Sequence, residues 1–436
     1  MLVNKGMSMY SNKNKKIAGI IAEYNPFHNG HKMQIKKTKE LTGSEYVIVV
    51  MSGDFVQRGE PAIVNKYNRT RMALLNGADL VIELPAAYAL SSAEGFAYGG
   101  VSILNKLNCV DYLSFGSESG DIDALSNIAK LLLNPGNEFN QSVLSDIKNG
   151  TSYPKALSNA LEKSGITQTF SNDSASNRYD LKEIFSPNNI LGIEYIKALL
   201  LLNSSITPVT IKREDNGYNS QTINEEYEYS SASSLRKILS EGINKPKTSL
   251  EKTDEAYKLC QKYIPEEVNR LLNNEKLVST NDFSNLIYYK LLSTFSVKDS
   301  NFTNDFLESF QDINLELCGK INKNLKDFRN VEQFIELLKS KNITYARISR
   351  VLYHILFDIS ESLVKSEPSY ARVLGFKKDS TELLNLIKNS SKIDLITKLA
   401  DAKTTPLLEK DIYISNIYEQ IAGTHINEYQ QSPIII

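Results

Sequence analysis

Short apolar runs alternate with longer helical patterns in the first third of the chain, and this alternation most limits the possible folds. Strands are predicted at residues 17–22, 46–51, 80–84 and 112–115, and helices from His31 and at residues 65–76, 91–107 and 121–133. Residues 46–51 form a continuous apolar run, which is typical of a strand buried on both faces. Alternating strands and helices build parallel sheets with helical crossovers, so we predict an open α/β sheet. Ligands bind such sheets at the carboxyl ends of the strands.

The pattern changes at about residue 250. Before it, weak signals predict a partly helical insertion at 134–180 with a mobile loop at 171–178, then a return of strand–helix character at 190–202 and a β-prone run at 208–212. After it, strand signals vanish, and Leu and Ile recur at helical spacing at residues 283–292, 331–338, 343–364 and 381–387. We therefore predict a flexible leader at residues 1–16, an α/β domain at 17–245 and a separate α-helical domain at 246–436.

Composition excludes several classes of protein. The 436 residues include 50 basic and 51 acidic side chains, so non-specific binding to nucleic acid through overall charge is excluded and any RNA contact needs a local patch. The three cysteines are far apart and odd in number, which argues against a disulfide framework or a zinc ribbon and fits a reducing cytoplasm. The apolar runs fall far short of the roughly 20 residues of a membrane helix. We expect a cytoplasmic protein with no membrane or DNA partner.

The candidate chemistry lies where the first predicted strand meets the first predicted helix. Two of the four histidines, His28 and His31, stand three residues apart there, with Gly30 between them. Glycine lets a backbone approach a phosphate closely, and a helix N-terminus attracts anions. Two imidazoles at this spacing can donate hydrogen bonds to phosphate oxygens in a transition state. The alternatives are half of a metal site, although no Cys or further His lies nearby, and a polar loop with incidental histidines; we predict no metal ligands.

A resemblance follows from this motif and from others in the same order. Residues 27–31 (FHNGH) match the H-x-G-H signature of the nucleotidylyltransferase superfamily, whose members direct attack on the α-phosphate of a nucleotide and release pyrophosphate. The wider set resembles one branch, the bacterial tRNA(Met) cytidine acetate ligases. It comprises 51–61 (MSGDFVQRGEP), 79–85 (DLVIELP), 115–118 (FGSE), 186–192 (SPNNILG), 210–213 (TIKR), 231–236 (SASSLR) and 346–350 (ARISR). The resemblance covers most of the chain and implies a Rossmann-like nucleotidylyltransferase domain with a parallel sheet.

The resemblance also implies roles for individual residues. His28 and His31 become the catalytic residues on the phosphates of ATP. Further ATP contacts are implied at Ile21, Ala22, Glu23, Tyr24, Asn25, Pro26, Phe27, Asn29, Gly30, Lys32, Met33, Gln34, Gly116, Asn188 and Arg213. The last three fit physically, because a glycine after a strand admits a ribose or base, an amide reads base edges or a ribose, and a guanidinium suits phosphate. Singly, each has an ordinary alternative as a turn, a helix cap or a surface ion pair.

Two further segments are candidates for anion and RNA binding. The segment at 231–236 departs from the superfamily form I-S-S-T-x-I-R; Ser231 and Arg236 can still bind the β/γ-phosphates and leaving pyrophosphate, or else the segment is a Ser-capped helix with a solvated Arg. Residues 341–378 hold seven basic and three acidic side chains with interleaved tyrosines, a pattern suited to binding RNA. The alternative is that this segment is a charged helix exposed to solvent. The predicted tRNA-binding residues are Arg347, Arg350, Lys377 and Lys378, with Gln57, Arg58 and Lys66 extending the surface beside the active site.

The family resemblance implies a complete reaction. Acetate attacks the α-phosphate of ATP, with Mg²⁺ bridging phosphates, and the acetyl-adenylate then acetylates N4 of the wobble cytidine of elongator tRNA(Met). Two other functions stay open. A small-molecule adenylyltransferase of cofactor synthesis, acting on nicotinate or pantetheine phosphate, has no obvious need for the long helical region. A non-catalytic, nucleotide-sensing RNA-binding protein does not need the intact His28, Gly30 and His31.

Overall fold

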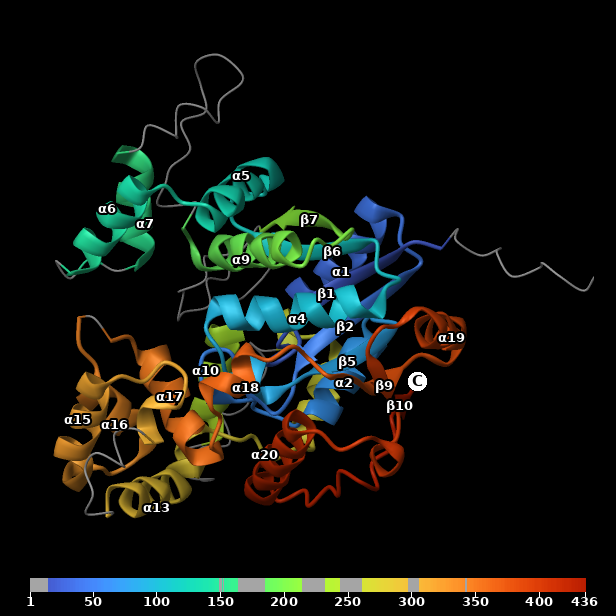
Figure 1. Ribbon diagram of the computed structural model, residues 1–436. Helices are drawn as coiled ribbons and strands as arrows, with labels where there is room; N and C mark the ends of the chain where they lie inside the picture. Colours follow the sequence, from blue (N-terminus) through green and yellow to red (C-terminus); the bar gives the residue numbers. More distant parts are fainter. Residues whose placement is uncertain are drawn as a thin grey trace, which may run out of the picture.

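The computed structural model describes residues 15–148, 151, 153–163, 185–213, 232–243, 261–296, 306–341 and 343–436. Its centre is an eight-stranded sheet in the order β10-β8-β5-β2-β1-β6-β7, with β9 paired to β8 (Figure 1). Five neighbouring strands run parallel: β1 (Ile17–Ala22), β2 (Tyr46–Ser52), β5 (Leu80–Leu84), β6 (Tyr112–Ser117) and β7 (Thr207–Lys212). The predicted α/β class with a parallel sheet is confirmed.

Helices cover both faces of the sheet because its strands are apolar on both sides. Along β2, Ile48 and Val50 belong to one core, and Val47 and Val49 belong to the other. The second core includes side chains of α1 (Asn29–Thr42) and α2 (Lys66–Leu75). The first includes side chains of α3 (Ala86–Ala89), α4 (Ala93–Leu107), α5 (Ile122–Leu133) and α9 (Pro187–Leu201). The helices predicted up to residue 133 therefore exist, with boundaries within two residues of those expected.

The described part of the insertion between α5 and α9 contains two helices. α6 (Asn137–Lys148) and α7 (Tyr153–Lys163) pack on each other and stand apart from the sheet (Figure 1). The predicted mobile loop at 171–178 lies outside the described residues. At the other end of the chain, Lys15 Nζ lies 2.8 Å from both Glu45 Oε1 and Glu382 Oε2. Residues 15 and 16 are thus part of the fold, and the rest of the predicted leader, residues 1–14, lies outside the described part.

The C-terminal part of the chain adds strands to the sheet, which corrects one prediction. β8 (Tyr370–Phe376) pairs antiparallel with β5, placing Arg372 opposite Glu83 and Phe376 opposite Leu80. β9 (Asp394–Ile396) and β10 (Ile434–Ile435) pair with β8 in parallel. The expectation of a purely helical region after residue 250 is wrong for these segments, because a charged side chain and a glycine interrupt the apolar pattern of β8. The predicted boundary at 245/246 lies outside the described residues.

Most of the remaining C-terminal chain is helical. Its longer helices are α12 (Glu266–Asn273), α13 (Ser284–Phe295), α15 (Leu315–Asn324), α16 (Val331–Leu338), α17 (Tyr345–Phe357), α19 (Thr381–Ser390) and α20 (Pro406–Ala422). The helical pattern predicted at 343–364 is two helices, α17 and the short α18 (Glu361–Lys365), because Asp358 takes a left-handed conformation that ends α17. Helices α13, α15, α16 and α17 gather beside the sheet (Figure 1). Among the described residues, no helix is both long enough and apolar enough to cross a membrane.

Buried ion pairs join β5, α2 and the C-terminal region. Lys66 Nζ lies 2.8 Å from Glu83 Oε1 and 3.1 Å from Glu428 Oε2. Arg372 donates to Glu428 and lies 3.3 Å from Glu83 Oε2. All four side chains are at most 5% exposed. The expectation that Lys66 extends an RNA-binding surface is therefore wrong, because its ammonium group is enclosed by carboxylates inside the protein.

Candidate active site

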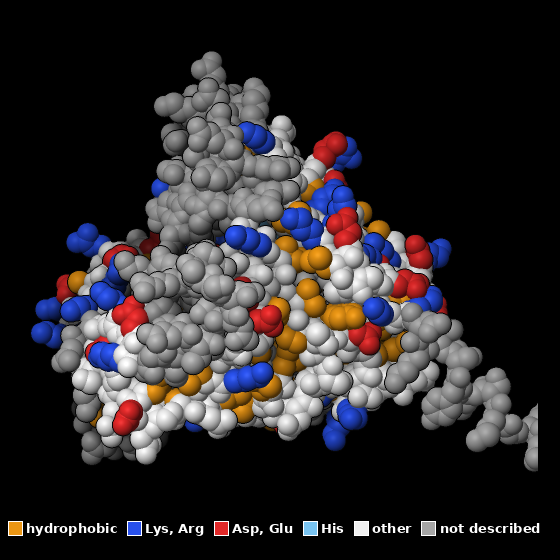
Figure 2. All heavy atoms as spheres, turned by 90° about the horizontal axis from the view of Figure 1, so that it is seen from above, with side chains coloured by type: hydrophobic (Ala, Val, Ile, Leu, Met, Phe, Trp, Pro, Cys, Tyr) orange, Lys and Arg blue, Asp and Glu red, His pale blue; other side chains and the backbone are white. Residues whose placement is uncertain are grey.

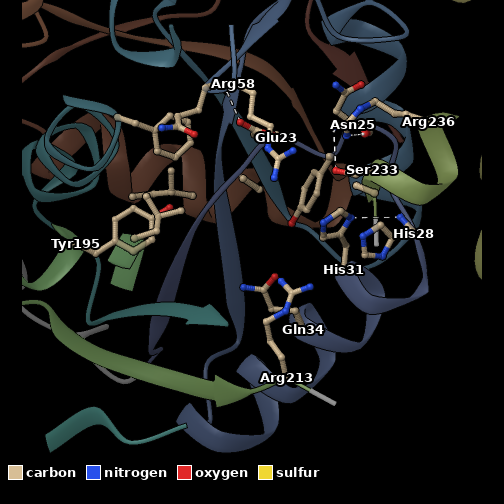
Figure 3. Close-up of a pocket in the computed structure, with 17 residues that line it drawn as sticks. Glu23, Asn25, His28, His31, Gln34, Arg58, Tyr195, Arg213, Ser233 and Arg236 are labelled. Atoms are coloured by element: carbon tan, nitrogen blue, oxygen red, sulfur yellow. Dashed lines mark hydrogen bonds between the residues drawn. The ribbon is translucent and has the colours of Figure 1, made fainter. Parts of the chain in front are cut away.

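A cavity of about 170 Å³ lies at the carboxyl ends of the central strands (Figure 3). In the sheet order, β1 lies between β2 and β6, so the chain reverses its direction of winding beside β1. A crevice forms at such a switch point because the crossovers leave on opposite faces. The cavity is lined by Ile21, Ala22, Glu23, Tyr24, Asn25, His28, His31, Gln34, Gln57, Arg58, Phe96, Leu191, Tyr195, Arg213, Ala232, Ser233 and Arg236.

The two histidines fix each other's orientation at the start of α1. His28 is the N-cap residue of α1. Its ring Nδ1 accepts the backbone N–H of Gly30 at 3.1 Å, and the backbone N–H of His28 donates to His31 Nδ1 at 3.3 Å. The rings stack with centroids 3.7 Å apart. A neutral imidazole whose Nδ1 accepts a hydrogen bond carries its proton on Nε2. The His31 ring is therefore set to donate from Nε2, as hydrogen bonding to a phosphate requires.

The site keeps His31 uncharged. Loss of contact with water lowers the pKa of His31 well below its usual value of about 6.5, and the neighbouring His28 and Arg213 act in the same direction. Packing against Tyr24 and Phe27, whose ring centroids lie 4.8 Å and 5.5 Å away, holds the ring in place. At neutral pH, His31 is a hydrogen-bond donor rather than a cation.

The loop between β1 and α1 is fixed from two sides. Asn25 Oδ1 accepts the Ile63 N–H at 2.8 Å, and Arg236 donates to the Asn25 carbonyl at 2.8 Å. Asn25 Nδ2 is buried and has no hydrogen-bond partner within the described part of the chain. Because a buried amide group without a partner is costly, this donor at the cavity is suited to a ligand.

Glu23 supplies a carboxylate to the same cavity. Its Oε1 accepts the Gln57 N–H at 2.8 Å. Desolvation raises the pKa of Glu23, while this hydrogen bond and the positive charges of Arg236 and Arg58 act in the opposite direction. In Figure 3, Glu23 and Arg58 lie on one side of the cavity and Gln34 and Arg213 on the other.

The structure brings the predicted residues Gly116, Asn188 and Arg213 together. Arg213 donates to Asn188 Oδ1 at 3.3 Å, and Asn188 Nδ2 donates to Glu118 at 2.7 Å. A Cβ at Gly116 would lie 3.4 Å from the Arg213 side chain. Only Arg213 lines the cavity, so Asn188 and Gly116 support it. The sequence pattern predicts that Gly116 follows a strand, but Gly116 lies within β6.

Helix α10 (Ala232–Ile243) contributes Ala232, Ser233 and Arg236 to the lining of the cavity. Arg236 lies 3.6 Å from Glu60 Oε2, and its Nη2 donates to Ser233 at 3.2 Å. Arg236 is therefore a partly buried, paired residue of the cavity and not the solvated Arg of the alternative interpretation. Ser231, predicted to bind ATP, lies outside the described residues; Ser233, which the prediction did not single out, lines the cavity instead.

Besides Gly116 and Asn188, six predicted ATP-binding residues do not line the cavity: Pro26, Phe27, Asn29, Gly30, Lys32 and Met33. Phe27 is fully buried behind His31, Asn29 Nδ2 donates to the Lys262 carbonyl at 3.1 Å, and Lys32 Nζ lies 3.6 Å from Glu267. Conversely, Phe96, Leu191 and Tyr195 line the cavity and were not predicted. Apolar residues that face a cavity have the same helical spacing as those that face a core, so the sequence held no signal for them.

The four predicted tRNA-binding residues do not share one surface. Arg350 is buried, with Nε 2.7 Å from Asp312 Oδ2, and Arg347 donates to the Asp312 carbonyl at 2.7 Å. Lys377 and Lys378 follow β8, which runs antiparallel to β5, so they lie at the amino ends of the parallel strands, opposite the cavity. Lys377 lies 3.6 Å from Asp79, and Lys378 is exposed.

The aromatic part of the RNA prediction is wrong for two of its three tyrosines, while the third, Tyr345, is partly exposed. Tyr353 and Tyr370 are at most 1% exposed, so they belong to the core and have no face available for a base. On the face seen in Figure 2, basic side chains are interspersed with acidic ones. Among the described residues, no three His, Cys, Asp or Glu side chains are arranged to hold a metal ion.

Comparisons with known proteins show what this chain is similar to. Residues 15–432 match the model of a family described as HIGH Nucleotidyl Transferase. The tRNA(Met) cytidine acetate ligase of Clostridium perfringens strain SM101 is 40% identical, over 96% of this chain and 99% of that protein. That of Thermoanaerobacter sp. strain X514 is 41% identical, over 92% and 94%. Crystal structures of Thermotoga maritima TmcAL, bound with alpha-thio ATP and without ligand, are 28% identical, cover 97% of this chain and 99% of theirs, and give TM-scores of 0.81 and 0.82.

Proposed function

We propose, from the premise that this chain belongs to the tRNA(Met) cytidine acetate ligases within the HIGH nucleotidyl transferase family, that it activates acetate with ATP and acetylates a tRNA. The observation that carries the proposal is the pair of stacked imidazoles, His28 and His31, each with Nδ1 engaged by a backbone N–H at the mouth of one cavity. The uncharged Nε2–H donor of His31, with the His28 ring stacked on it, fits the oxygens of a phosphate on which charge develops.

The first step joins acetate to AMP. A carboxylate oxygen of acetate attacks the α-phosphorus of ATP, the bond from that phosphorus to the bridging oxygen breaks, and pyrophosphate leaves. No side-chain nucleophile takes part, so the protein contributes position and charge stabilisation. His28 and His31 hold the phosphates, and Arg213 and Arg236 face the charge that leaves with pyrophosphate. The buried Asn25 Nδ2 supplies one further donor.

The second step transfers the acetyl group. The exocyclic N4 of the wobble cytidine of elongator tRNA(Met) attacks the acetyl carbonyl carbon, the bond to the AMP oxygen breaks, and the nitrogen loses a proton. This reaction belongs in the cytoplasm, where the tRNA is. Exposed cations such as Lys378 are available to tRNA, whereas the buried Arg350 is not.

Mg²⁺ does not have a protein cage in the described part of the chain, since no cluster of three acidic, His or Cys side chains is present there. Mg²⁺ prefers few protein ligands and usually binds through substrate phosphates. We therefore assign it to the incoming ATP and give it no protein ligand.

Incubation with ATP, labelled acetate and tRNA tests the proposal. The expected result is label in tRNA as N4-acetylcytidine, found by mass spectrometry of nucleosides, with one AMP and one pyrophosphate released per acetyl group. His28→Asn and His31→Asn should stop acetate-dependent pyrophosphate release while leaving tRNA binding unchanged. Pyrophosphate release without label in tRNA would refute the ligase and leave an adenylyltransferase; turnover unchanged by both substitutions would remove the catalytic assignment.

A further inference from the structure

The loop between the short strands β3 (Phe55–Val56) and β4 (Glu60–Pro61) carries Gln57 and Arg58 to the cavity. We call residues 55–61 the cavity loop. It is bound to the cavity at two points: the Gln57 N–H donates to Glu23 at 2.8 Å, and Glu60 lies 3.6 Å from Arg236. The position of Arg58 therefore depends on how firmly this loop is held.

Helix α17, far away in the sequence, lies directly against the cavity loop. Gly59 has a φ of +78°, and a Cβ at this position would lie 2.4 Å from the backbone nitrogen of Arg350. Ser349 Oγ donates to the Gly59 carbonyl. Such close approach of two backbones requires glycine and leaves no room for movement of the loop toward the helix.

The Arg350 side chain holds the same loop. Its Nε lies 2.7 Å from Asp312 Oδ2, and its Nη1 donates to the Gln57 carbonyl over 3.5 Å. The two side chains of the ion pair are only 10% and 18% exposed. Arg347 donates to the Asp312 carbonyl at 2.7 Å and fixes the acidic partner in turn. Removal of one partner from an ion pair with this little contact with water leaves the other charge without compensation inside the protein.

We propose that Arg350 and Asp312 are positioning residues of the adenylation site. They act through the cavity loop, which they hold against α17 so that Gln57 and Arg58 face the substrates. The proposal rests on the proposed function, because it concerns the rate of acetyl-adenylate formation. It replaces the interpretation of Arg350 as an RNA contact, which its basic neighbourhood in the sequence had favoured.

The two interpretations predict opposite effects of Asp312→Asn. If Arg350 binds a phosphate of tRNA, removal of its acidic partner frees the guanidinium and strengthens tRNA binding. If the pair positions the cavity loop, the same substitution leaves tRNA binding unchanged and slows adenylate formation. The paired substitution Arg350→Gln with Asp312→Asn removes both charges and leaves neither unpaired inside the protein. It therefore keeps the test valid where a single variant folds poorly.

The assay is acetate-dependent exchange of labelled pyrophosphate into ATP, with and without tRNA, together with tRNA binding over a range of salt concentrations. We expect Asp312→Asn and the paired variant to lower kcat/KM for exchange about tenfold, with tRNA affinity and its salt dependence unchanged. Arg350→Lys, which keeps the charge but not the reach to Gln57, should give an intermediate rate. The exposed pair Lys365 and Glu361, in the same region, provides the matched control: Lys365→Gln with Glu361→Gln should exchange normally.

A cycle with Arg58→Gln separates positioning from general destabilisation. If Arg350 acts through the cavity loop, Arg58→Gln slows exchange in the wild type but has little further effect in the paired variant. If the effects of Arg58→Gln and of the paired variant on the exchange rate simply multiply, the two sites act independently and the proposal is wrong. Wild-type exchange in the paired variant, or stronger tRNA binding by Asp312→Asn, would also overturn it. Absence of acetate-dependent exchange in the wild-type protein would instead refute the proposed function, on which this inference depends.

Discussion

His28 and His31 illustrate how single residues acquire chemistry from a turn of backbone. Each Nδ1 accepts a backbone N–H of the same turn, so neither ring is free to flip, and His31 Nε2 is left as a donor. Desolvation lowers the pKa of His31, so the site begins without the positive charge that an ATP phosphate would later favour. An anion next to an imidazole stabilises its protonated form and raises its pKa.

We therefore expect proton uptake by His31 when ATP binds below about pH 6.5. In the free protein the folded state binds fewer protons at His31 than the unfolded state. The free energy of unfolding should thus fall as the pH drops below about 6.5, and ATP affinity should rise over the same range. Titration calorimetry in buffers of different ionisation enthalpy measures the uptake. Subtracting the proton uptake measured for His31→Asn from that of the wild type removes the contribution from protonation of ATP itself. Equal uptake by both proteins would contradict the prediction.

A second residue-scale prediction concerns Asn188, whose side chain links Arg213 to Glu118. Asn188→Ala removes one acceptor of Arg213 and so weakens the contacts that orient the guanidinium. We expect ATP affinity to fall about tenfold, or about 1.4 kcal/mol, because an oriented charged donor is lost without loss of the charge itself. The thermal midpoint should change little, since the site is partly exposed. ATP affinity equal to that of the wild type would show that Arg213 is held by other contacts.

Among the elements, those set by local pattern were predictable and those set by distant partners were not. The strands and helices up to residue 133 follow apolar periodicity, and the motif at 27–31 marks its own place at a strand–helix junction. β8 was not predicted because a charged residue within an apolar run usually indicates an exposed position. Arg372 is buried only because Glu83 and Glu428 lie beside it. The pairing of Arg350 with Asp312 was not predictable for the same reason, since Asp312 is 38 positions away.

The cavity loop gives a prediction at this scale through its glycine. Gly59 and Gly43 both have positive φ, at +78° and +63°. A Cβ added at Gly59 would clash with the backbone of α17, whereas a Cβ at Gly43 would have no other atom within 4 Å. Gly43→Ala should cost about 1 kcal/mol of unfolding free energy through backbone strain alone and leave exchange activity unchanged. Gly59→Ala must also move the loop away from α17, so it should cost more and slow adenylate formation. Chemical denaturation and pyrophosphate exchange measure the two effects; equal behaviour of both variants would exclude a packed loop.

At the scale of the whole molecule, the C-terminal region completes the sheet on which the active site stands. β8 pairs with β5, β10 pairs with β8, and Lys66 is enclosed by Glu83 from one part of the chain and Glu428 from the other. Helix α17 also supports the cavity loop. The two proposed activities, activation of acetate and binding of tRNA, therefore share one continuous core, and a division of the chain at residue 245 separates groups that neutralise each other.

The last prediction is that a fragment of residues 1–245 does not fold on its own. Removal of β8 exposes the full edge of β5, and the buried Lys66 and Glu83 lose Glu428 and Arg372. Breaking a buried ion pair by removing one partner costs about 3–5 kcal/mol, a large part of the 5–15 kcal/mol by which domains are stable. The fragment should lack a cooperative thermal transition by circular dichroism and be cleaved rapidly by protease under conditions in which the full chain resists. Cooperative unfolding of the fragment with ATP binding intact would show instead that the N-terminal strands suffice, and that the buried ion pairs contribute little to the stability of the sheet.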